Sequence, residues 1–574
     1  MSRLTPRAWR RRRIAPAARL LRFVLLSTAL ACCHGLGSRC AVADPPAPAA
    51  LAAGGAATEP DVEALLAQAR TNARLAAEGL ERSHRYIEGW LRHADPATGL
   101  IPRNLGDGRD LWNAQDAAAD NYPFMVLAAA LTDRALFEGR LREMLRTETR
   151  LTSRLDRLPD TFRFSTGTFA SAEPKLDGII FGASEYVKDG LLPLAEWLGP
   201  SPWSERMLGI LDDIWKHAPI DTPFGRIPST NIEVNGEQLQ ALARAYWMTG
   251  RREYLDWAVR LGDYYLLGEN HPTRDLPRLR LRDHGCEIVG GLSELYVAVD
   301  RAAPEKKAAY RRPLYELYDT ILAVGRNEHG LLYDWIEPRA GKRAERLCDT
   351  WGYNLNALYT VHLIDGCEPY RLAARKALGS LAEHYRGYAW EGASADGYAD
   401  AIESALNLYN REPIDSAADW IDSETRVMWS KQRDDGVIEG WHGDGNFTRT
   451  TIMYVLWKTR GAWIEPWRPD VRLGAAAQGE AIYLVVAADE PWRGAIRFDR
   501  PRHQTNFHLP FDYPRINQFP EWFTVEESGR YVVENLDQAT KQTVGGAELQ
   551  RGLRVELPGG AERRWRIASA GASR

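Results

Sequence analysis

Apolar positions recur with helical spacing from about residue 60 to about residue 463, and short polar clusters interrupt them roughly every 50 to 65 residues. Each cluster is rich in Gly, Asp, Asn, His and aromatic residues and leads directly into an amphipathic helix. Outer helices are expected at about 60–92, 132–150, 203–217, 251–266, 303–324, 369–387 and 415–432, and inner helices from near Asp116, Gly182, Val234, His284, Asp349, Asp396 and Asp444. Such hairpins must stack to bury their apolar faces. The pattern predicts a mainly α fold, an (α/α)6–7 toroid of six or seven hairpins around a central cleft.

The pattern changes after Pro466, where β-branched residues alternate with polar ones in AIYLVVAADE, GLRVELPGG and RRWRIAS. We therefore expect a toroid domain over 60–465, followed by a C-terminal, antiparallel, β-sandwich-like domain over 466–574. Residues 502–523 contain too many prolines and aromatic residues for a strand and are expected to form a long loop. We expect this loop to join the two domains rather than to cover the cleft.

The first 43 residues resemble a secretory signal. Arg10 to Arg13 precede the apolar run LLRFVLLSTALACC, and small residues follow in AVAD, which predicts cleavage after Ala43. Residues 44–59 form a linker rich in Pro, Ala and Gly. The apolar run is short for a membrane span, so a secreted or periplasmic protein without a membrane anchor is expected. A lipoprotein attached through Cys32 or Cys33 is the lesser alternative.

Composition narrows the possible partners. The net charge of -4 gives no reason to expect nucleic acid, whereas 20 Trp and 23 Tyr supply rings that stack on sugar faces. The chain has no phosphate loop, dinucleotide fingerprint, G-x-S-x-G elbow or H-E-x-x-H motif at a suitable place. We expect no organic cofactor and no metal, because the HGDGN segment lacks the acidic residue that would close a calcium loop.

A helical toroid with polar helix starts in register, a signal before it and a β domain after it resembles two groups of carbohydrate-active enzymes. These are the toroid polysaccharide lyases and the six-hairpin glycosidases. The resemblance implies that the inner-helix starts line a cleft for a poly- or oligosaccharide. Helix N-termini carry partial positive charge, which favours an acidic substrate such as a uronate polymer.

Cleavage of a uronate polymer by β-elimination is the preferred interpretation. It requires neutralisation of the carboxylate, a base for the C5 proton and an acid for the leaving oxygen. The resemblance implies that Asn235 or Asn231 and His284 polarise the carboxylate and that Tyr353 is the base. Arg346 would assist by charge and by lowering the pKa of Tyr353.

Hydrolysis with inversion is the alternative, and it requires two carboxyl groups across the cleft. The candidates are Asp116, Asp120, Glu185, Asp189, Asp283, Glu287, Asp349, Asp396, Asp400, Glu403 and Asp444. Any of them could simply cap a helix. Asp349 and Asp396 are the preferred catalytic carboxyls because Trp351 and Tyr398 stand beside them and could hold a sugar. Asp116 and Asp444 are expected to contact the substrate.

The densest polar cluster is the segment EGWHGDGNFTRT, residues 439–450. Its glycines let the backbone approach a ligand, and Trp441, His442 and Arg449 are expected to bind substrate. Arg449 could hold a uronate carboxylate through two hydrogen bonds. Two further classes stay open: a glycan-binding protein without catalysis and a sugar epimerase.

Overall fold

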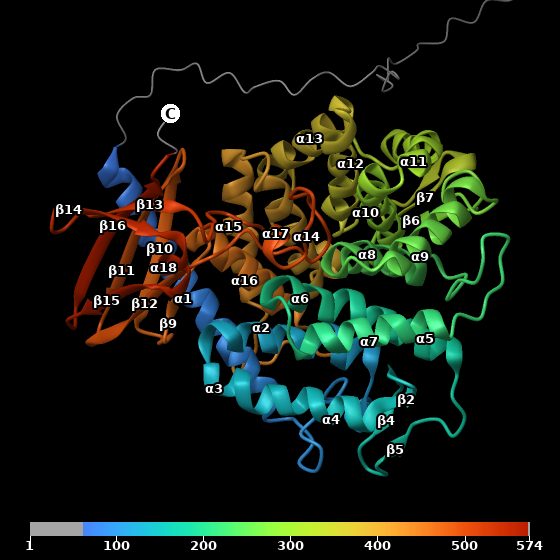
Figure 1. Ribbon diagram of the computed structural model, residues 1–574, viewed down its shortest axis with the longest axis horizontal. Helices are drawn as coiled ribbons and strands as arrows, with labels where there is room; N and C mark the ends of the chain where they lie inside the picture. Colours follow the sequence, from blue (N-terminus) through green and yellow to red (C-terminus); the bar gives the residue numbers. More distant parts are fainter. Residues whose placement is uncertain (1–60, 572–574) are drawn as a thin grey trace, which may run out of the picture. The chain divides into compact units, whose positions relative to one another are not determined.

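The computed structural model describes residues 61–571 (Figure 1). The expected signal peptide and linker, residues 1–59, lie outside this range. Within it, no helix is both long enough and apolar enough to cross a membrane. The described chain is mainly helical up to Thr459 and continues in antiparallel strands, in agreement with the order of elements that the sequence predicts.

The helical part follows the predicted periodicity closely. Its α-helices are α1 (Val62–Leu91), α2 (Tyr122–Thr132), α3 (Arg134–Leu136), α4 (Arg142–Thr152), α5 (Leu176–Glu185), α6 (Leu192–Leu198), α7 (Pro202–Lys216), α8 (Ile232–Thr249), α9 (Arg252–Gly262), α10 (Glu287–Ala302), α11 (Pro304–Val324), α12 (Trp351–Asp365), α13 (Glu368–His384), α14 (Ala395–Tyr409), α15 (Asp415–Trp429) and α16 (Asn446–Thr459). Wide π-helical turns are η1 (Ala114–Asn121), η2 (Phe137–Leu141), η3 (Tyr186–Leu191) and η4 (Asp263–Leu267), and short 3₁₀ turns are η5 (Asp283–Gly285), η6 (Pro338–Ala340) and η7 (Trp390–Gly392).

The inner helices contact one another in a closed series. Helix α8 packs on α10, α10 on α12, α12 on α14 and α14 on α16; α16 then contacts α2, η1 packs on η3, and α5 contacts α8. Glycine allows the closest of these approaches, since a Cβ at Gly236 of α8 would lie 2.4 Å from the carbonyl carbon of Glu287. The helix start expected at Gly182 is wrong, and close packing between helices explains this glycine instead. That residue lies inside α5, where an added Cβ would be 2.8 Å from Gln115 Oε1 of η1.

Short strands lie between the helices and were not predicted. They are β1 (Leu111–Trp112), β2 (Ser153–Leu155), β3 (Leu158–Pro159), β4 (Phe162–Arg163), β5 (Thr168–Phe169), β6 (Leu279–Arg280), β7 (Trp335–Glu337) and β8 (Lys342–Arg343). Strands of two or three residues are too short to show an alternating pattern, so the sequence gives no periodic signal for them.

The C-terminal part contains two antiparallel sheets. Its elements are β9 (Ala462–Glu465), β10 (Val471–Gln478), β11 (Ala481–Ala488), β12 (Trp492–Phe498), α17 (Arg502–Thr505), β13 (Arg530–Asn535), β14 (Thr540–Gly545), α18 (Gly546–Arg551), β15 (Leu553–Leu557) and β16 (Ala561–Ser569). One sheet has the order β10–β11–β16–β13–β14 and the other β15–β12–β9. Ile482, Ile496 and Trp565, from both sheets, share one apolar core.

Helix α1 belongs to both parts of the molecule (Figure 1). Near its beginning, Leu66 and Ala69 pack with Tyr483 and Val485 of the five-stranded sheet. Asn72 Nδ2 donates a hydrogen bond to the carbonyl oxygen of Ala475, at 2.8 Å. Further along, α1 packs on α16 and α2. The first described helix therefore fixes the strands against the helices.

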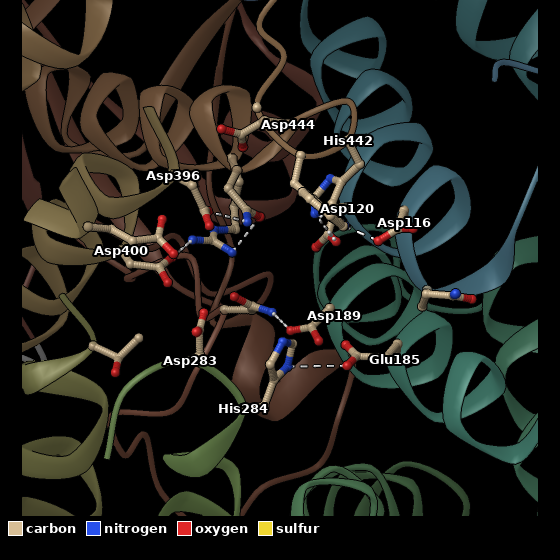
Figure 2. A pocket seen from close by; sticks show the side chains of 18 of the residues that line it. Asp116, Asp120, Glu185, Asp189, Asp283, His284, Asp396, Asp400, His442 and Asp444 are labelled. Atoms are coloured by element: carbon tan, nitrogen blue, oxygen red, sulfur yellow. Dashed lines mark hydrogen bonds and ion pairs between the residues drawn. The ribbon is translucent and has the colours of Figure 1, made fainter. Parts of the chain in front are cut away.

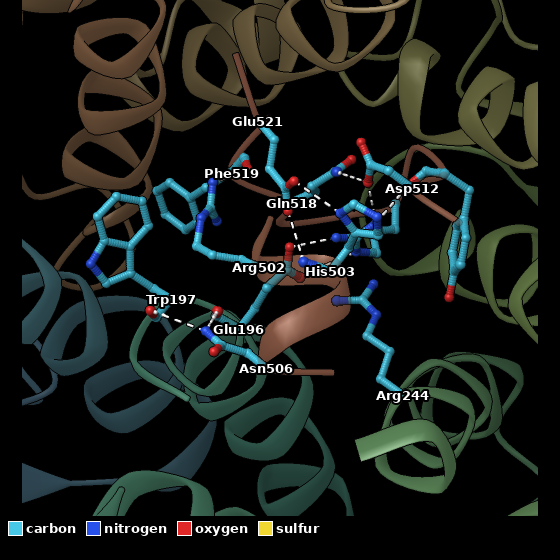
Figure 3. Close-up of polar contacts among 12 residues, drawn as sticks. Glu196, Trp197, Arg244, Arg502, His503, Asn506, Asp512, Gln518, Phe519 and Glu521 are labelled. Atoms are coloured by element: carbon cyan, nitrogen blue, oxygen red, sulfur yellow. Dashed lines mark hydrogen bonds and ion pairs between the residues drawn. The ribbon is translucent and has the colours of Figure 1, made fainter. Parts of the chain in front are cut away.

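The long loop after α17 also joins the two parts, as expected (Figure 3). The buried Arg515 guanidinium lies 2.5 Å from Glu196 of α6, and Asn506 Nδ2 donates to the carbonyl oxygen of Glu196 at 2.6 Å. The tip of the loop continues inward, and Ile516 and Asn517 line the central cavity. The loop thus also contributes to the cavity lining, which the sequence analysis did not favour.

Candidate active-site cavity

The starts of the inner helices surround a cavity of about 430 Å³ (Figure 2). Carboxylic acids dominate its lining: Asp116, Asp120, Glu185, Asp189, Asp283, Glu287, Glu391, Asp396, Asp400, Glu439 and Asp444. Lys188, Arg449, His284 and His442 are the cationic or titratable bases among the lining residues. In Figure 2, Asp396 and Asp400 lie on one side of the pocket, and Asp116 and Asp120 lie on the other. The sequence predicted polar helix starts around a cleft. The main chemical feature of the cavity is its excess of acidic side chains.

Turn η1 supplies two carboxyl groups with different surroundings. Asn113 caps the turn, with its side-chain oxygen accepting from Ala117 N. Asp116 Oδ2 lies 2.6 Å from Arg103 Nε and also accepts a hydrogen bond from Asn113 Nδ2. Asp120 is four residues on, and His442 Nε2 lies 3.5 Å from its Oδ2. Asp116 is thus paired with a guanidinium, whereas Asp120 faces mainly other acids.

This difference sets the protonation of Asp120. The pKa of Asp120 is raised to about 7, chiefly by burial; His442 opposes the rise, and the carboxylates of Asp189, Asp116 and Asp444 add to it. Burial disfavours the imidazolium of His442, but the charges of Asp120 and Asp116 outweigh burial and raise its pKa. Asp120 is therefore protonated below about pH 7 and can donate its proton there.

Turn η3 carries Asp189, whose carboxyl group is held in the ionised state. Asp189 Oδ1 accepts hydrogen bonds from Lys188 Nζ at 2.7 Å and from Asn517 Nδ2 at 2.8 Å. Lys188 Nζ also lies 2.7 Å from Glu287 Oε1. Burial alone would raise the pKa of Asp189, but the Lys188 ammonium lowers it. Because η1 packs on η3, the neutral Asp120 and the ionised Asp189 share one wall of the cavity.

A third group of polar side chains comes from α12, α14 and α16. Tyr353 OH and Arg449 Nη2 both donate to Asp400 Oδ1, at 2.9 and 2.6 Å. Arg449 Nε also lies 2.8 Å from Glu403 Oε2. Burial raises the pKa of Asp400 to about 7 against the effect of Arg449. Burial also raises the pKa of Tyr353, so the lowering expected for a base is absent from this tyrosine.

The segment 439–450 also lines the cavity. Trp441 is 79% exposed and lies at the cavity, with the Arg103 guanidinium 5.6 Å from its ring centre. Asp444 is buried, and burial raises its pKa. Asn446 Nδ2 donates to Asp396 Oδ1 at 2.7 Å, and burial likewise raises the pKa of Asp396. An exposed indole above polar groups is a suitable surface for a sugar ring.

Eight of the sequence-predicted site residues line the cavity: Asp116, His284, Tyr353, Asp396, Trp441, His442, Asp444 and Arg449. His284 Nδ1 lies 2.6 Å from Glu233 Oε1 and 3.3 Å from Glu185 Oε1. The cavity thus brings together the predicted residues of the segment 439–450 with those of α12 and α14. Their roles remain predictions.

The structure does not bring together the four residue types expected for elimination. Asn231 caps α8, with its side chain accepting from Glu233 N. Asn235 is buried and donates to the Ser229 carbonyl oxygen and to Tyr265 OH, at 2.8 and 2.9 Å. Arg346 Nε lies 2.7 Å from Asp334 Oδ2. These three side chains satisfy local partners and are not among those that line the cavity.

Three other predicted residues are also outside the lining. Trp351 and Tyr398 are buried rings within the apolar core. Asp349 is buried, its Oδ1 accepts from Thr350 N at 2.9 Å, and burial raises its pKa. A residue at a helix start can point into the core as well as into the cleft, and the sequence does not distinguish the two directions.

Several residues that line the cavity were not preferred in the sequence analysis or were not named there. Asp120, Asp189 and Asp400 were among the candidate carboxylates but were not preferred, although each follows another acidic residue by four positions on its helix. Lys188 adjoins Asp189 in the segment VKDG, and such a buried Lys–Asp pair has no signature in the sequence. Asn517 could be suspected only from the unusual length of its loop.

Comparison with known proteins gives a likeness of fold. No protein-family model matches the chain, and no curated protein matches it. A glycoside hydrolase family 76 mannosidase from Bacteroides thetaiotaomicron aligns with TM-score 0.38 and 13% identity over 66% of this chain and 99% of that one. A family 76 α-1,6-mannanase of Salegentibacter, an inactive variant in complex with α-1,6-mannotetrose, aligns with TM-score 0.37 and 10% identity over 66% of this chain and 97% of that one.

A cellobiose 2-epimerase from Spirochaeta thermophila aligns with TM-score 0.35 and 15% identity over 68% of this chain and 97% of that one. These similar structures are carbohydrate-active enzymes, the class that the sequence resembles. At this level of likeness they assign no reaction to the chain, and its chemistry has to be inferred from the cavity.

Proposed function

We propose that the protein is a glycoside hydrolase that cleaves a glycan without carboxylate groups, with Asp120 as general acid and Asp189 as general base. The observation that supports this most strongly is the unequal surroundings of the two carboxyl groups on η1 and η3. Asp120 faces other acids and has a pKa of about 7, while Asp189 accepts a hydrogen bond from the Lys188 ammonium. Paired carboxyls in opposite protonation states are what glycoside hydrolysis requires.

The reaction follows from these two states. Asp120 gives its proton to the glycosidic oxygen as the bond to the anomeric carbon breaks. Asp189 accepts a proton from a water molecule whose oxygen forms the new bond to that carbon, so one water is consumed and two sugar ends are formed. Positive charge develops on the ring in the transition state, and the negative charge of Asp189 stabilises it.

The charge of the lining supports hydrolysis over the elimination that the sequence favoured. Lys188 is held by Asp189 and Glu287, and Arg449 is held by Asp400 and Glu403. Among the lining residues that the structure describes, a uronate carboxylate would therefore meet many acids and no unengaged Lys or Arg. A neutral or cationic sugar fits this field better.

The experiment is to incubate the purified protein with neutral glycans, amino-sugar polymers and uronate polysaccharides, and to follow reducing ends and ultraviolet absorbance together. We expect new reducing ends without absorbance, and proton NMR should show a product with inverted anomeric configuration because water attacks directly. Absorbance from a new double bond would contradict the proposal and favour elimination.

Two variants test the assignment. Asp120→Asn and Asp189→Asn should each lower kcat by roughly 10²–10⁴-fold, the usual size of a general acid or base contribution. Asp283→Asn, on the same cavity, is the matched control and should change kcat by less than about 10-fold, since Asp283 pairs with Arg280. Full activity in Asp120→Asn would rule out its role as the acid.

A further inference from the structure

A second acidic cluster lies in the wall of the cavity beside the proposed acid and base. Glu185 is at the end of α5, Glu233 and Glu237 are in the first turns of α8, and His284 is in η5. One potential ligand atom from each of the four lies within 4.8 Å of those of the other three. Glu233 and Glu237 are four residues apart and therefore share one face of α8. Three carboxyl groups thus converge on one imidazole.

Within this cluster, the carboxyl group of Glu237 has no hydrogen-bond partner among the described residues. Its side chain is buried, with 0% relative exposure. Both of its carboxylate oxygens are without a hydrogen-bond donor among residues 61–571. Burying a carboxyl group with no donor or counterion is strongly unfavourable. Lys188 is close, but its ammonium is hydrogen-bonded to Asp189 and Glu287. Burial also raises the pKa of Glu237, but its two oxygens still lack a partner, and a cation bound between these four side chains would supply one.

We infer that Glu185, Glu233, Glu237 and His284 bind one divalent transition-metal cation, of the Mn²⁺ or Zn²⁺ type. Three carboxylate oxygens suit a hard divalent cation, and the imidazole nitrogen favours first-row transition metals over Ca²⁺ and Mg²⁺. At metal–ligand distances of about 2.0–2.2 Å, ligand atoms around one ion lie roughly 3–4 Å apart. The spacing of the cluster requires only small side-chain adjustments to meet this.

The orientation of His284 agrees with a metal ligand. Its Nδ1 faces the acids, 2.6 Å from Glu233 Oε1 and 3.3 Å from Glu185 Oε1 (Figure 2 shows His284 beside Glu185). Glu185 and His284 also line the cavity. The cation would therefore lie in the cavity wall, enclosed by its four protein ligands.

The other group of acids with a histidine provides a contrast. Asp116, Asp120 and His442 also approach one another closely. Asp116, however, already has Arg103 at 2.6 Å and a hydrogen bond from Asn113. Its charge is satisfied by the protein, so the observation that carries the proposal at Glu237 has no counterpart there.

The test uses the tag-free full chain after treatment with EDTA and dialysis. Isothermal titration with MnCl₂, ZnCl₂, CaCl₂ and MgCl₂ and elemental analysis of the dialysed product should show one Mn²⁺ or Zn²⁺ per chain, with a raised melting temperature. Glu237→Gln keeps the shape of the side chain and removes the carboxylate ligand. It should fold without metal as well as the native chain and lose roughly 100-fold in metal affinity. Asp396→Asn is the matched control, with the same carboxyl-to-amide change at a residue that lines the cavity, and should keep the affinity.

Three outcomes would overturn the proposal: no stoichiometric binding of any of the four ions, unchanged binding by Glu237→Gln, or preference for Ca²⁺ or Mg²⁺ over both transition metals. The inference does not depend on the proposed hydrolysis. It is decided by metal content and affinity, whereas the hydrolase assignment is decided by products and by Asp120→Asn, so either can fail without the other.

Discussion

Identical side chains in this cavity differ in charge because their neighbours differ. Asp116 lies against a guanidinium, Asp189 against an ammonium, and Asp120 against other carboxylates. Desolvation penalises the charged form of Asp120 and Asp189, and the Lys188 ammonium compensates for it at Asp189. The division of work between acid and base in the proposed reaction is therefore a property of the neighbours and not of the aspartates themselves.

The pH dependence of activity should report Asp120. Its raised pKa of about 7 means that the proton is present below pH 7 and is lost as the pH rises through that value. The groups that face it are His442, Asp189, Asp116 and Asp444. We expect kcat/KM to fall about 10-fold per pH unit on the alkaline side of about pH 7.

The measurement is a pH–rate profile of the native enzyme and of Asp120→Asn with the same substrate. The alkaline limb should be absent from the residual activity of the variant, because an amide does not titrate. An alkaline limb that persists unchanged in Asp120→Asn would assign the ionisation to another group.

At the scale of elements, the cavity depends on wide turns and on a loop from outside the helical part. η1 and η3 are π-helical where they carry Asp116, Asp120, Lys188 and Asp189. Such turns occur frequently at functional sites, where they change the direction of side chains relative to a regular helix. The loop after α17 then adds Asn517, whose side-chain amide donates a hydrogen bond to Asp189 although the two residues are far apart in the sequence.

Replacement of Asn517 should reduce activity without unfolding the protein. Its φ of 61° is left-handed, so Asn517→Gly keeps the backbone unstrained and removes only the amide. Loss of this hydrogen bond to the proposed base should lower kcat by roughly 10- to 100-fold, since bonds to charged groups contribute about 1.5–3 kcal/mol.

Asn506→Ala in the same loop is the control. Asn506 donates to the carbonyl oxygen of Glu196, away from the cavity, so this change should lower the melting temperature and leave kcat unchanged. Equal kcat values for native protein and Asn517→Gly would show that Asp189 needs no support from the loop.

At the scale of the whole molecule, buried ion pairs hold the C-terminal part to the helices (Figure 3). The side chains of Arg515 and Glu196 are both fully buried, and Arg515 also lies 3.0 Å from Asp512. Tyr513, from the same loop, donates to Glu294 of α10 at 3.1 Å. A buried pair contributes little net energy when intact, but loss of one partner leaves an uncompensated charge.

Arg515→Met should therefore destabilise the protein by about 3–5 kcal/mol, measured by urea unfolding. The double variant Arg515→Met with Glu196→Gln should recover much of this loss, because Glu196 then carries no unpaired charge and Asp512 keeps Arg411 at 2.8 Å. Arg493→Met is the matched control at an exposed pair with Glu556, and its effect should not exceed about 1 kcal/mol. Equal effects at both positions would mean that the loop does not depend on its buried charges.

The sequence by itself determined the order and extent of the elements. Periodicity located helices such as α7, α11 and α15 to within a few residues, and alternation located the strands after Pro466, because both patterns depend on neighbours along the chain. The same local patterns indicated that polar helix starts gather around a cleft. They could not show that Trp351, Tyr398 and Asp349 turn into the core.

Only the tertiary structure decided which side chains meet. Asn517 donates a hydrogen bond to Asp189, which is 328 positions away in the sequence. Glu237 of α8 lies close to His284 of η5. Such contacts depend on how helices pack, and the pKa of each carboxyl group depends on charges brought near it by that packing. The chemistry of the cavity is therefore set by distances through space, which a pattern along the chain does not record.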